Sequence, residues 1–213
     1  MNFSLDRNSF VAKKIGHLNG EVVLDVGCRD KIFKKKLSGN FKYIGIDFIH
    51  TYNNAANGEE GEFINHNLEN GLPIEIQNID IINALDVLEH IENIHKLFRD
   101  FFTKSNKTII IALPNMAYYK FRLNFLITGV ISGKYPFKEN PVKDKHRWIP
   151  NYYSINNFIN KNLNNDWESK EYNFIAERKN NFIIYFIEKF LSNFFPNLFV
   201  YEKIFIFTKK IKN

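Results

Sequence analysis

The amino-acid sequence predicts an α/β protein whose core is a doubly wound, mostly parallel β-sheet in a single domain. Two features near the start of the chain support this prediction. The apolar run 22–26 leads into a glycine turn at Gly27, and a second apolar run, 43–47, ends in Asp47. Apolar runs of this kind are typical of parallel strands that are buried on both faces. They alternate with amphipathic segments farther along, as a parallel sheet with right-handed crossovers requires.

In the first half of the chain, hydrophobic periodicity and turn residues set the expected elements. A leading helix is expected over 6–18, where the apolar residues approximate one face. A short helix over 31–37 links the first two strands. The stretch 53–61, rich in Asn, Gly and Glu, is a loop by composition. The strands expected in this half are 21–26, 42–47, 62–67 and 79–84.

In the second half, a helix over 88–102 follows the fourth strand, because its apolar residues recur on one face. The fifth strand, 107–113, ends at Pro114. A helix over 116–130 ends near Gly129, and a polar loop containing proline follows it. Long irregular segments of this kind tend to be functional lids, so residues 116–150 are expected to form a lid that holds the site of the substrate. The remaining expected elements are the helices 154–164 and 181–195 and the strands 167–174 and 198–208.

The charge at the end of the first strand indicates which type of ligand the site binds. A dinucleotide site needs the pattern G-x-G-x-x-G, but Arg29 and Ile32 stand at its second and third glycine positions. Asp25 lies at the carboxyl end of the first strand, where it would repel a phosphate. A cationic nucleoside fits better, and S-adenosylmethionine is such a ligand. Asp47, about twenty residues past the glycine turn, is placed to accept both ribose hydroxyls.

Five segments occur in the order 22–30, 43–47, 65–73, 80–91 and 109–115. In sequence and order they resemble the motifs of class I S-adenosylmethionine-dependent methyltransferases. The resemblance covers about residues 10–160 and favours the small-molecule branch that includes methyltransferase type 11 and MetW-like proteins. It implies a Rossmann-like fold with an antiparallel last strand, here 198–208. The domain is then 1–213, with a core of about 10–115 and 150–213 and a lid insertion at 116–150.

The resemblance also implies roles for individual residues at the cofactor site. Asp25 pairs with the methionine ammonium, directly or through water, or else is only a strand-end turn residue. Asp47 binds the ribose or caps a helix. Arg29 pairs with the ligand carboxylate or caps the turn, and Cys28 is either a ligand-loop residue or a small space-filler. The cofactor-binding residues expected are Asp25, Gly27, Cys28, Arg29, Asp47, Phe48, Asn67, Leu68, Asn83 and Ala84.

Within that set, the adenine and methionine ends of the ligand are expected to have separate partners. The family usually has aspartate where this chain has Asn67, whose carbonyl oxygen still accepts a hydrogen bond from the adenine amino group. Leu68 flanks the adenine ring. Asn83 and Ala84 line the methionine end through backbone groups.

An alcohol acceptor needs a general base, and two histidines are candidates. His90 follows the fourth strand in a Leu-Glu-His pattern, where it acts as the base or only packs and caps. His146, the second candidate, lies in the lid. Its neighbour Arg147 either holds an anionic acceptor or is a surface arginine. Glu89 is expected to be an acid in the first turn of the following helix, where it interacts favourably with the helix dipole. No metal ligand set is expected. The substrate residues expected are Arg122, Arg147 and Trp148.

Composition restricts the compartment and the partners. The chain has 213 residues and a single cysteine, which excludes a disulfide framework and favours a reducing, cytoplasmic compartment. Apolar runs are too short to span a bilayer, and the start of the chain lacks a signal-peptide pattern. The net charge of +6 fits an anionic partner or simply solvated lysines. The amphipathic segment 181–195 is expected to be core or a homodimer face, or else to contact a lipid-linked acceptor or a membrane surface.

The leading functional prediction is therefore methyl transfer to a small-molecule acceptor, at oxygen, on a sugar- or lipid-type metabolite. An RNA methyltransferase is the second option, although nucleic-acid binding is disfavoured because Asn83–Asp86 departs from the motif of enzymes that methylate base amino groups. A non-catalytic, partner-regulating S-adenosylmethionine-binding protein of MetW type stays open. A nicotinamide oxidoreductase fits poorly, given the loop and the charge at Asp25.

Overall fold

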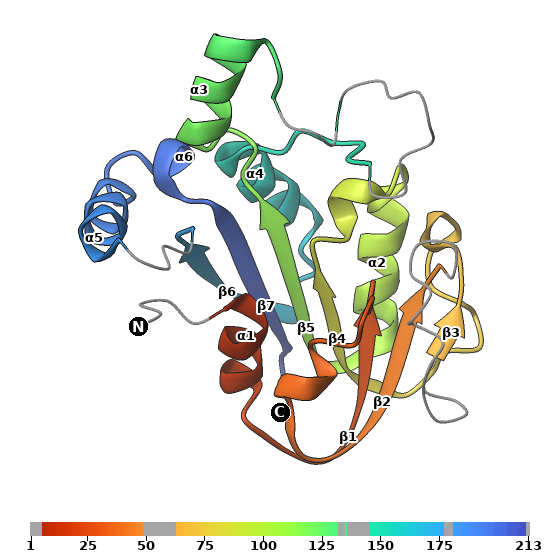
Figure 1. The fold of residues 1–213 in the computed structure, drawn as a ribbon. Coiled ribbons are helices and arrows are strands. Elements are labelled where there is room, and N and C mark those ends of the chain that lie inside the picture. The colour runs from red at the N-terminus through yellow and green to blue at the C-terminus, as the bar shows by residue number, and fades with distance from the viewer. Residues whose placement is uncertain (1–5, 49–62, 132–134, 136–144, 177–180, 212–213) are drawn as a thin grey trace.

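A computed structural model describes residues 6–48, 63–131, 135, 145–176 and 181–211, and these form a layered α/β fold around one sheet (Figure 1). The seven strands lie in the order β3-β2-β1-β4-β5-β7-β6. The first five are parallel to their neighbours, whereas β7 runs antiparallel to β5 and β6 antiparallel to β7. The prediction of a doubly wound, mostly parallel sheet with an antiparallel last strand is confirmed. The strands are β1 His17–Val26, β2 Ser38–Asp47, β3 Phe63–Asn65, β4 Ile79–Leu85, β5 Ser105–Pro114, β6 Trp167–Phe174 and β7 Glu202–Lys209.

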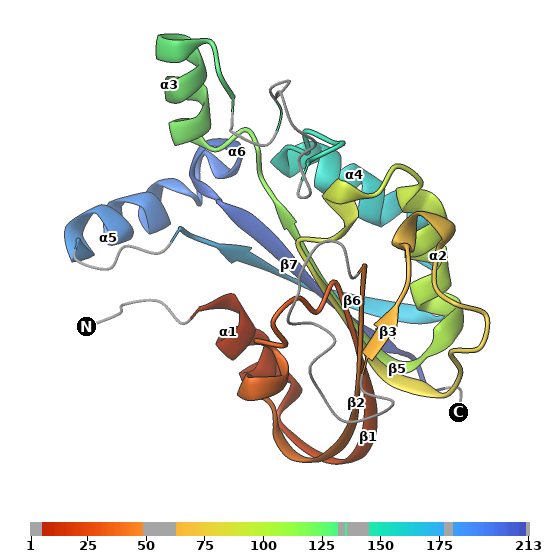
Figure 2. The same ribbon diagram turned by 45° about the vertical axis from the view of Figure 1, so that its right-hand side comes forward.

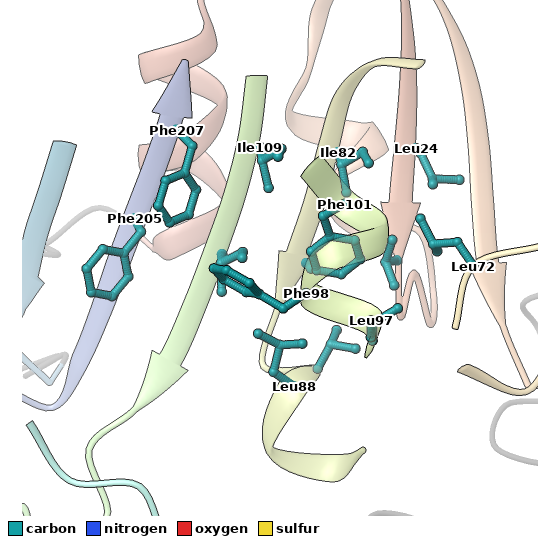
Figure 3. Close-up of a cluster of buried hydrophobic side chains, with 14 of the residues drawn as sticks. Leu24, Leu72, Ile82, Leu88, Leu97, Phe98, Phe101, Ile109, Phe205 and Phe207 are labelled. Carbon is teal, nitrogen blue, oxygen red and sulfur yellow. The ribbon is translucent and has the colours of Figure 1, made fainter. Parts of the chain in front are cut away.

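Helices cover both faces of the sheet, which is why its central strands are apolar on both sides (Figure 2). Leu24, Ile82 and Ile109 point to the face covered by α2 and α4, whereas their neighbours in sequence point to the face covered by α1. Figure 3 shows Phe98 and Phe101 of α2 against the first of these faces. The α-helices are α1 Arg7–Ile15, α2 Ile94–Lys104, α3 Tyr119–Thr128, α4 Tyr152–Asn162, α5 Phe182–Leu191 and α6 Pro196–Phe199, and the 3-10 helices are η1 Lys34–Lys36, η2 Leu68–Asn70 and η3 Leu88–His90.

Five predicted helices are shorter than expected, among them α1 and α3, and the reasons can be identified for the other three. The link over 31–37 contains only η1, because Arg29 and Lys31 have φ angles of 45° and 54°, outside the helical range. The segment 88–102 divides into η3 and α2, since α2 begins only where the side chain of Asn93 caps its first turn. The segment 181–195 ends as an α-helix at Leu191, and α6 then begins with a proline at its first position.

The aromatic helix α5 is not part of the core, and the reading of it as core is wrong. Phe186 and Phe190 are 47% and 62% exposed, and the one buried residue of the helix is Glu188. Its apolar residues therefore point outward. None of the helices in the described part of the chain is long and apolar enough to cross a bilayer. Of the predicted lid, 132–134 and 136–144 lie outside the described residues, as does the predicted loop at 53–61.

A buried and an exposed phenylalanine allow a test of the fold by their effects on stability. Replacing Phe98, which is fully buried, by alanine leaves a cavity against the sheet and should lower the free energy of unfolding by about 3–5 kcal/mol. Phe190→Ala, the matched control on the exposed face of α5, should change it by less than about 0.5 kcal/mol. Urea unfolding followed by circular dichroism measures both. Equal losses in the two variants would contradict the placement of α5 outside the core.

Candidate functional site

A cavity opens at the carboxyl ends of β1 and β4, where the strand order reverses. Ligands of doubly wound sheets bind at this switch point. The cavity holds about 100 Å³, and the predicted residues that line it are Asp25, Gly27, Cys28, Arg29 and Asn83. Ala84 is fully buried inside β4, opposite Val26, and Leu85 lines the cavity in its place.

The carboxylate of Asp25 lies at the floor of this cavity and is only 3% exposed. Its Oδ2 accepts a hydrogen bond of 2.6 Å from the Tyr43 hydroxyl, and its Oδ1 accepts one of 2.7 Å from Asn83 Nδ2. Burial raises the pKa of Asp25 to about 6, and the two hydrogen bonds oppose that rise. The carboxyl therefore carries a negative charge at pH 7 in a site that is costly for it, and a ligand cation would offset that cost.

The glycine turn is held by the backbone and by Asp47. Gly27 has φ 69°, and a Cβ there would lie 2.7 Å from Cγ2 of Val87, so no larger residue fits. Asp47 Oδ2 accepts from the backbone N–H of Arg29 at 3.0 Å, and Oδ1 accepts from that of Phe48 at 2.7 Å. Each oxygen keeps a second lone pair for a ribose hydroxyl. The side chain of Asp47 thus fixes the turn, whichever ligand it binds.

Cys28 behaves as a small buried residue. Its sulfur packs beside Gly45, where an added Cβ would lie 2.8 Å from it. Burial, together with the carboxylates of Asp25 and Asp47, raises the pKa of its thiol. The cysteine therefore stays a neutral thiol at physiological pH.

The predicted adenine-binding residues lie outside the lining of this cavity. Asn67 Oδ1 accepts from the backbone N–H of Glu69 at 3.1 Å and so caps η2. Leu68 is buried, whereas Phe48 is 42% exposed. The adenine contacts of Asn67 and Leu68 stay predictions, as does the contact of Phe48 with the cofactor.

Arg7 and Asn8 of α1 also line the cavity, although no sequence motif had indicated them. The guanidinium of Arg7 forms ion pairs with Asp86 and, at 3.2 Å, with Glu202. Burial and the nearby charge of Asp86 raise the pKa of Glu202 to about 8, against the opposing effect of Arg7. Arg7, Asp86 and Glu202 are far apart in the sequence, so only the fold, which brings them to one sheet edge, identifies this group.

A second cluster lies farther along the same edge, at η3. The rings of His90 and His146 are 4.5 Å apart, edge to face, although 56 residues separate them in the sequence. Glu89 is 2% exposed, and its Oε1 lies 3.8 Å from Nε2 of His90. Glu89 is a first-turn acid, as predicted, but of the short helix η3 rather than of a helix that continues to residue 102, because α2 begins only at Ile94. The two candidate bases and this carboxylate form one group.

An apolar cavity of about 260 Å³ borders the cluster. It lies between η3, the end of β5 and the start of α4, and Glu89 and Trp148 both line it. The indole of Trp148 donates a 2.7 Å hydrogen bond to the carbonyl of Ile91, which fixes the ring at the wall. A mainly apolar cavity with one carboxylate is a typical small-molecule site.

The sequence profile of a methyltransferase-domain family matches residues 5–174. The chain belongs to this family. Among solved structures, the small RNA methyltransferase HEN1 superposes with a TM-score of 0.62 at 14% identity, over 97% of this chain and 25% of that one. The chain thus spans about a quarter of HEN1. No curated protein matches the sequence.

Two further structures are similar over most of both chains. An S-adenosylmethionine-dependent methyltransferase from Archaeoglobus fulgidus gives a TM-score of 0.52 at 17% identity, over 95% of this chain and 92% of that one. Magnesium protoporphyrin IX methyltransferase from Synechocystis, solved with bound S-adenosylhomocysteine, gives 0.52 at 14% identity, over 95% and 80%. Such identities establish the fold. The predicted methyltransferase family is confirmed, and its MetW-like subtype is not decided.

Of the substrate residues predicted for the methyltransferase, Trp148 alone lines the apolar cavity. Arg147 forms ion pairs with Glu69 at 3.1 Å and Glu92 at 3.2 Å. Arg122 is exposed on α3, and its Nε donates to the carbonyl of Ala117. The roles predicted for these two arginines stay predictions.

The raised pKa of Asp25 makes the stability of the methyltransferase depend on pH. Because the folded state holds this proton more tightly than the unfolded state, the contribution of Asp25 to stability is largest below pH 4 and is lost as the pH rises to about 6. Asp25→Asn does not titrate, so its free energy of unfolding should gain about 2 kcal/mol relative to the wild type between pH 4 and pH 7. Urea unfolding of both proteins at intervals of one pH unit measures this gain. A constant difference across that range would contradict the buried, desolvated carboxyl.

Proposed function

We propose that this protein transfers the methyl group of S-adenosylmethionine to an oxygen of a small-molecule acceptor of sugar or lipid type. The observation that carries this proposal is the pairing of two sites at one sheet edge. The first is a cavity with a buried carboxylate at the switch point, and the second is an apolar cavity lined by Glu89, which clusters with His90 and His146 behind it. Family membership supplies the reaction class.

Charge and hydrogen bonding support the cofactor assignment. Asp25 offers the methionine ammonium a negative charge in a site of low dielectric, where the attraction is strong. Gly27 keeps the turn free of a side chain, so that the methionine portion can lie against the backbone. Asp47 retains lone pairs for the ribose hydroxyls.

The reaction is a displacement at carbon. A bond forms between the acceptor oxygen and the methyl carbon, the C–S bond breaks, and its electron pair returns to sulfur to give a neutral thioether. The acceptor proton leaves to a general base. The protein must align the two reactants and exclude water, and the apolar walls of the second cavity suit both tasks.

The cluster at η3 supplies the base. His90 Nδ1 lies 3.0 Å from the carbonyl of Lys145, so it carries a proton and leaves Nε2 as the acceptor nitrogen. His146 is buried beside it, and Glu89 stabilises an imidazolium once it forms. Two imidazoles beside the carboxylate that lines the cavity favour oxygen as the methyl acceptor, because alcohols need this assistance.

Ligand-induced stabilisation tests the cofactor site. S-adenosylhomocysteine at about 100 times its dissociation constant should stabilise the protein by about 2.7 kcal/mol, and NAD should not. Asp47→Ala should abolish the shift, whereas Asp30→Ala, an exposed acid of the same turn, should keep it. Asp47→Asn retains an acceptor oxygen and controls for collapse of the turn. Unchanged binding by Asp47→Ala would place the cofactor elsewhere.

The acceptor class is tested separately. The protein is incubated with labelled S-adenosylmethionine and with separated small-molecule, lipid and RNA fractions of a cell extract. A labelled, alkali-stable product in a small-molecule or lipid fraction is expected. Label confined to RNA would favour the second function, and cofactor binding without any labelled product would favour a non-catalytic protein of MetW type.

A further inference from the structure

We propose that Glu89, His90 and His146 bind a divalent transition-metal ion at the wall of the acceptor cavity. One ligand atom from each residue lies within 4.8 Å of the other two. Ligand atoms about 2.1 Å from a tetrahedral ion lie about 3.4 Å apart, so a closure of up to about 1.4 Å completes the site. Glu89 and His146 are 2% and 6% exposed, which places the cluster out of bulk water.

Hydrogen bonds already set both rings in the metal-binding tautomer. His90 Nδ1 faces the carbonyl of Lys145 at 3.0 Å and can only donate to it. The Tyr135 hydroxyl donates to the carbonyl of Trp148 at 2.7 Å, so its oxygen is left to accept from Nδ1 of His146 at 3.1 Å. Both Nε2 atoms then present a lone pair. Ligating histidines generally have their second nitrogen held by such a group.

The donor set selects the type of ion. Two imidazoles and one carboxylate suit Zn²⁺, Co²⁺, Mn²⁺ or Fe²⁺, whereas Mg²⁺ and Ca²⁺ prefer oxygen alone. Three protein ligands leave open positions toward the cavity. An acceptor hydroxyl bound there would lose its proton more readily, as metal-bound water does, and the proton would pass to water, because the ion would occupy Nε2 of His90 and take over its role as base. That consequence rests on the proposed function, but metal binding itself does not.

Equilibrium dialysis of the full chain against Zn²⁺, and the visible spectrum of the Co²⁺ adduct, test the site. The wild type should bind one equivalent. Glu89→Gln and His90→Asn should bind at least about 100-fold more weakly, which exceeds the effect expected of an outer-sphere change. His17→Ala, an exposed histidine at the start of β1, is the matched control and should bind as the wild type does.

The outcomes separate this proposal from the cofactor assignment. Stabilisation by S-adenosylhomocysteine should persist in Glu89→Gln, which also shows that the variant folds. Absence of stoichiometric binding in the wild type, or equal binding by Glu89→Gln, would overturn the metal site and leave the methyltransferase proposal intact. Loss of metal in His17→Ala alone would show an adventitious surface ion, and would equally overturn it.

A different observation, the inverted polarity of α5, carries a second inference. The side of α5 that faces the protein is polar: the carboxylate of Glu188 accepts hydrogen bonds from the hydroxyls of Tyr119 at 2.7 Å and Tyr118 at 3.2 Å. The outward residues are apolar and 39–69% exposed: Phe182, Ile183, Ile184, Phe186, Ile187 and Phe190. A soluble surface helix has the opposite arrangement.

The neighbouring helix α3 shares this exposure. None of its ten residues, all described, is buried, and Leu126 and Ile127 are each 80% exposed. Figures 1 and 2 show α3 and α5 projecting from the body of the molecule, with α6 between them. So many exposed large apolar side chains on two adjacent helices mark an interaction surface.

We infer that α3 and α5 bind the surface of an anionic lipid bilayer. The only acid on either helix is the buried Glu188, whereas Lys120, Arg122 and Lys189 are exposed. Basic residues around an apolar face are attracted to anionic headgroups, but they would repel their copies across a symmetric dimer interface. Each helix has ten residues, about 15 Å, so it would lie in the interface rather than cross the bilayer.

Sedimentation with vesicles tests this surface. The protein should bind phosphatidylcholine vesicles containing about 30% phosphatidylglycerol more tightly than pure phosphatidylcholine, and less tightly as salt rises. Phe186→Ser with Phe190→Ser, and Leu126→Ser with Ile127→Ser, should each weaken binding at least about tenfold. Ile74→Ser, an 83% exposed residue away from both helices, is the control. Absence of vesicle binding, or a dimer that the same variants dissociate in ultracentrifugation, would overturn the inference.

Discussion

The buried carboxylate of Asp25 is the interaction on which the rest of the site depends. It lies on β1 and accepts hydrogen bonds from Tyr43 on β2 and Asn83 on β4. The switch point lies between β1 and β4, and β2 pairs with β1, so one side chain links the three strands at the edge where ligands of this fold bind. The same burial raises its pKa, which means that the fold maintains a costly charge there. Such a cost is understandable where a cationic ligand neutralises it.

The sequence predicted the strand ends and the turn at this edge because their signals are local. Apolar runs, the turn at Gly27 and the acid at Asp47 all lie within a span of about 26 residues, and parallel pairing of β1 with β2 and β4 follows from them. The residues that sequence reasoning missed, Arg7 and Asn8, reach the cavity only because α1 packs beside the strand ends. No periodicity or spacing in α1 indicates that contact.

Elsewhere, tertiary contacts overrode local patterns. The helix predicted over 31–37 failed because Arg29 and Lys31 adopt positive φ angles to follow the turn that Asp47 holds. The amphipathic pattern of 181–195 correctly predicted a helix but not its orientation. Periodicity identifies an apolar face without showing what that face contacts, and here Glu188 rather than the phenylalanines is buried.

The proposed metal site and the proposed membrane surface both concern the methyl acceptor: the first its reacting oxygen, the second the place where it resides. His90 and His146 were alternatives in the sequence, since neither position indicates the other, and the fold makes them neighbours around Glu89. The backbone of that segment is fixed as well, because the N–H groups of Arg147 and Trp148 both donate to the carbonyl of Glu89. Chain 145–150 is therefore tied to η3, and the acceptor cavity has a firm wall. The three metal-type ligands beside this wall need only a small closure to hold an ion that activates a hydroxyl. The outward apolar helices have no such role in chemistry. The most economical account is that the wall selects the reacting oxygen and the helices select the surface on which the acceptor resides.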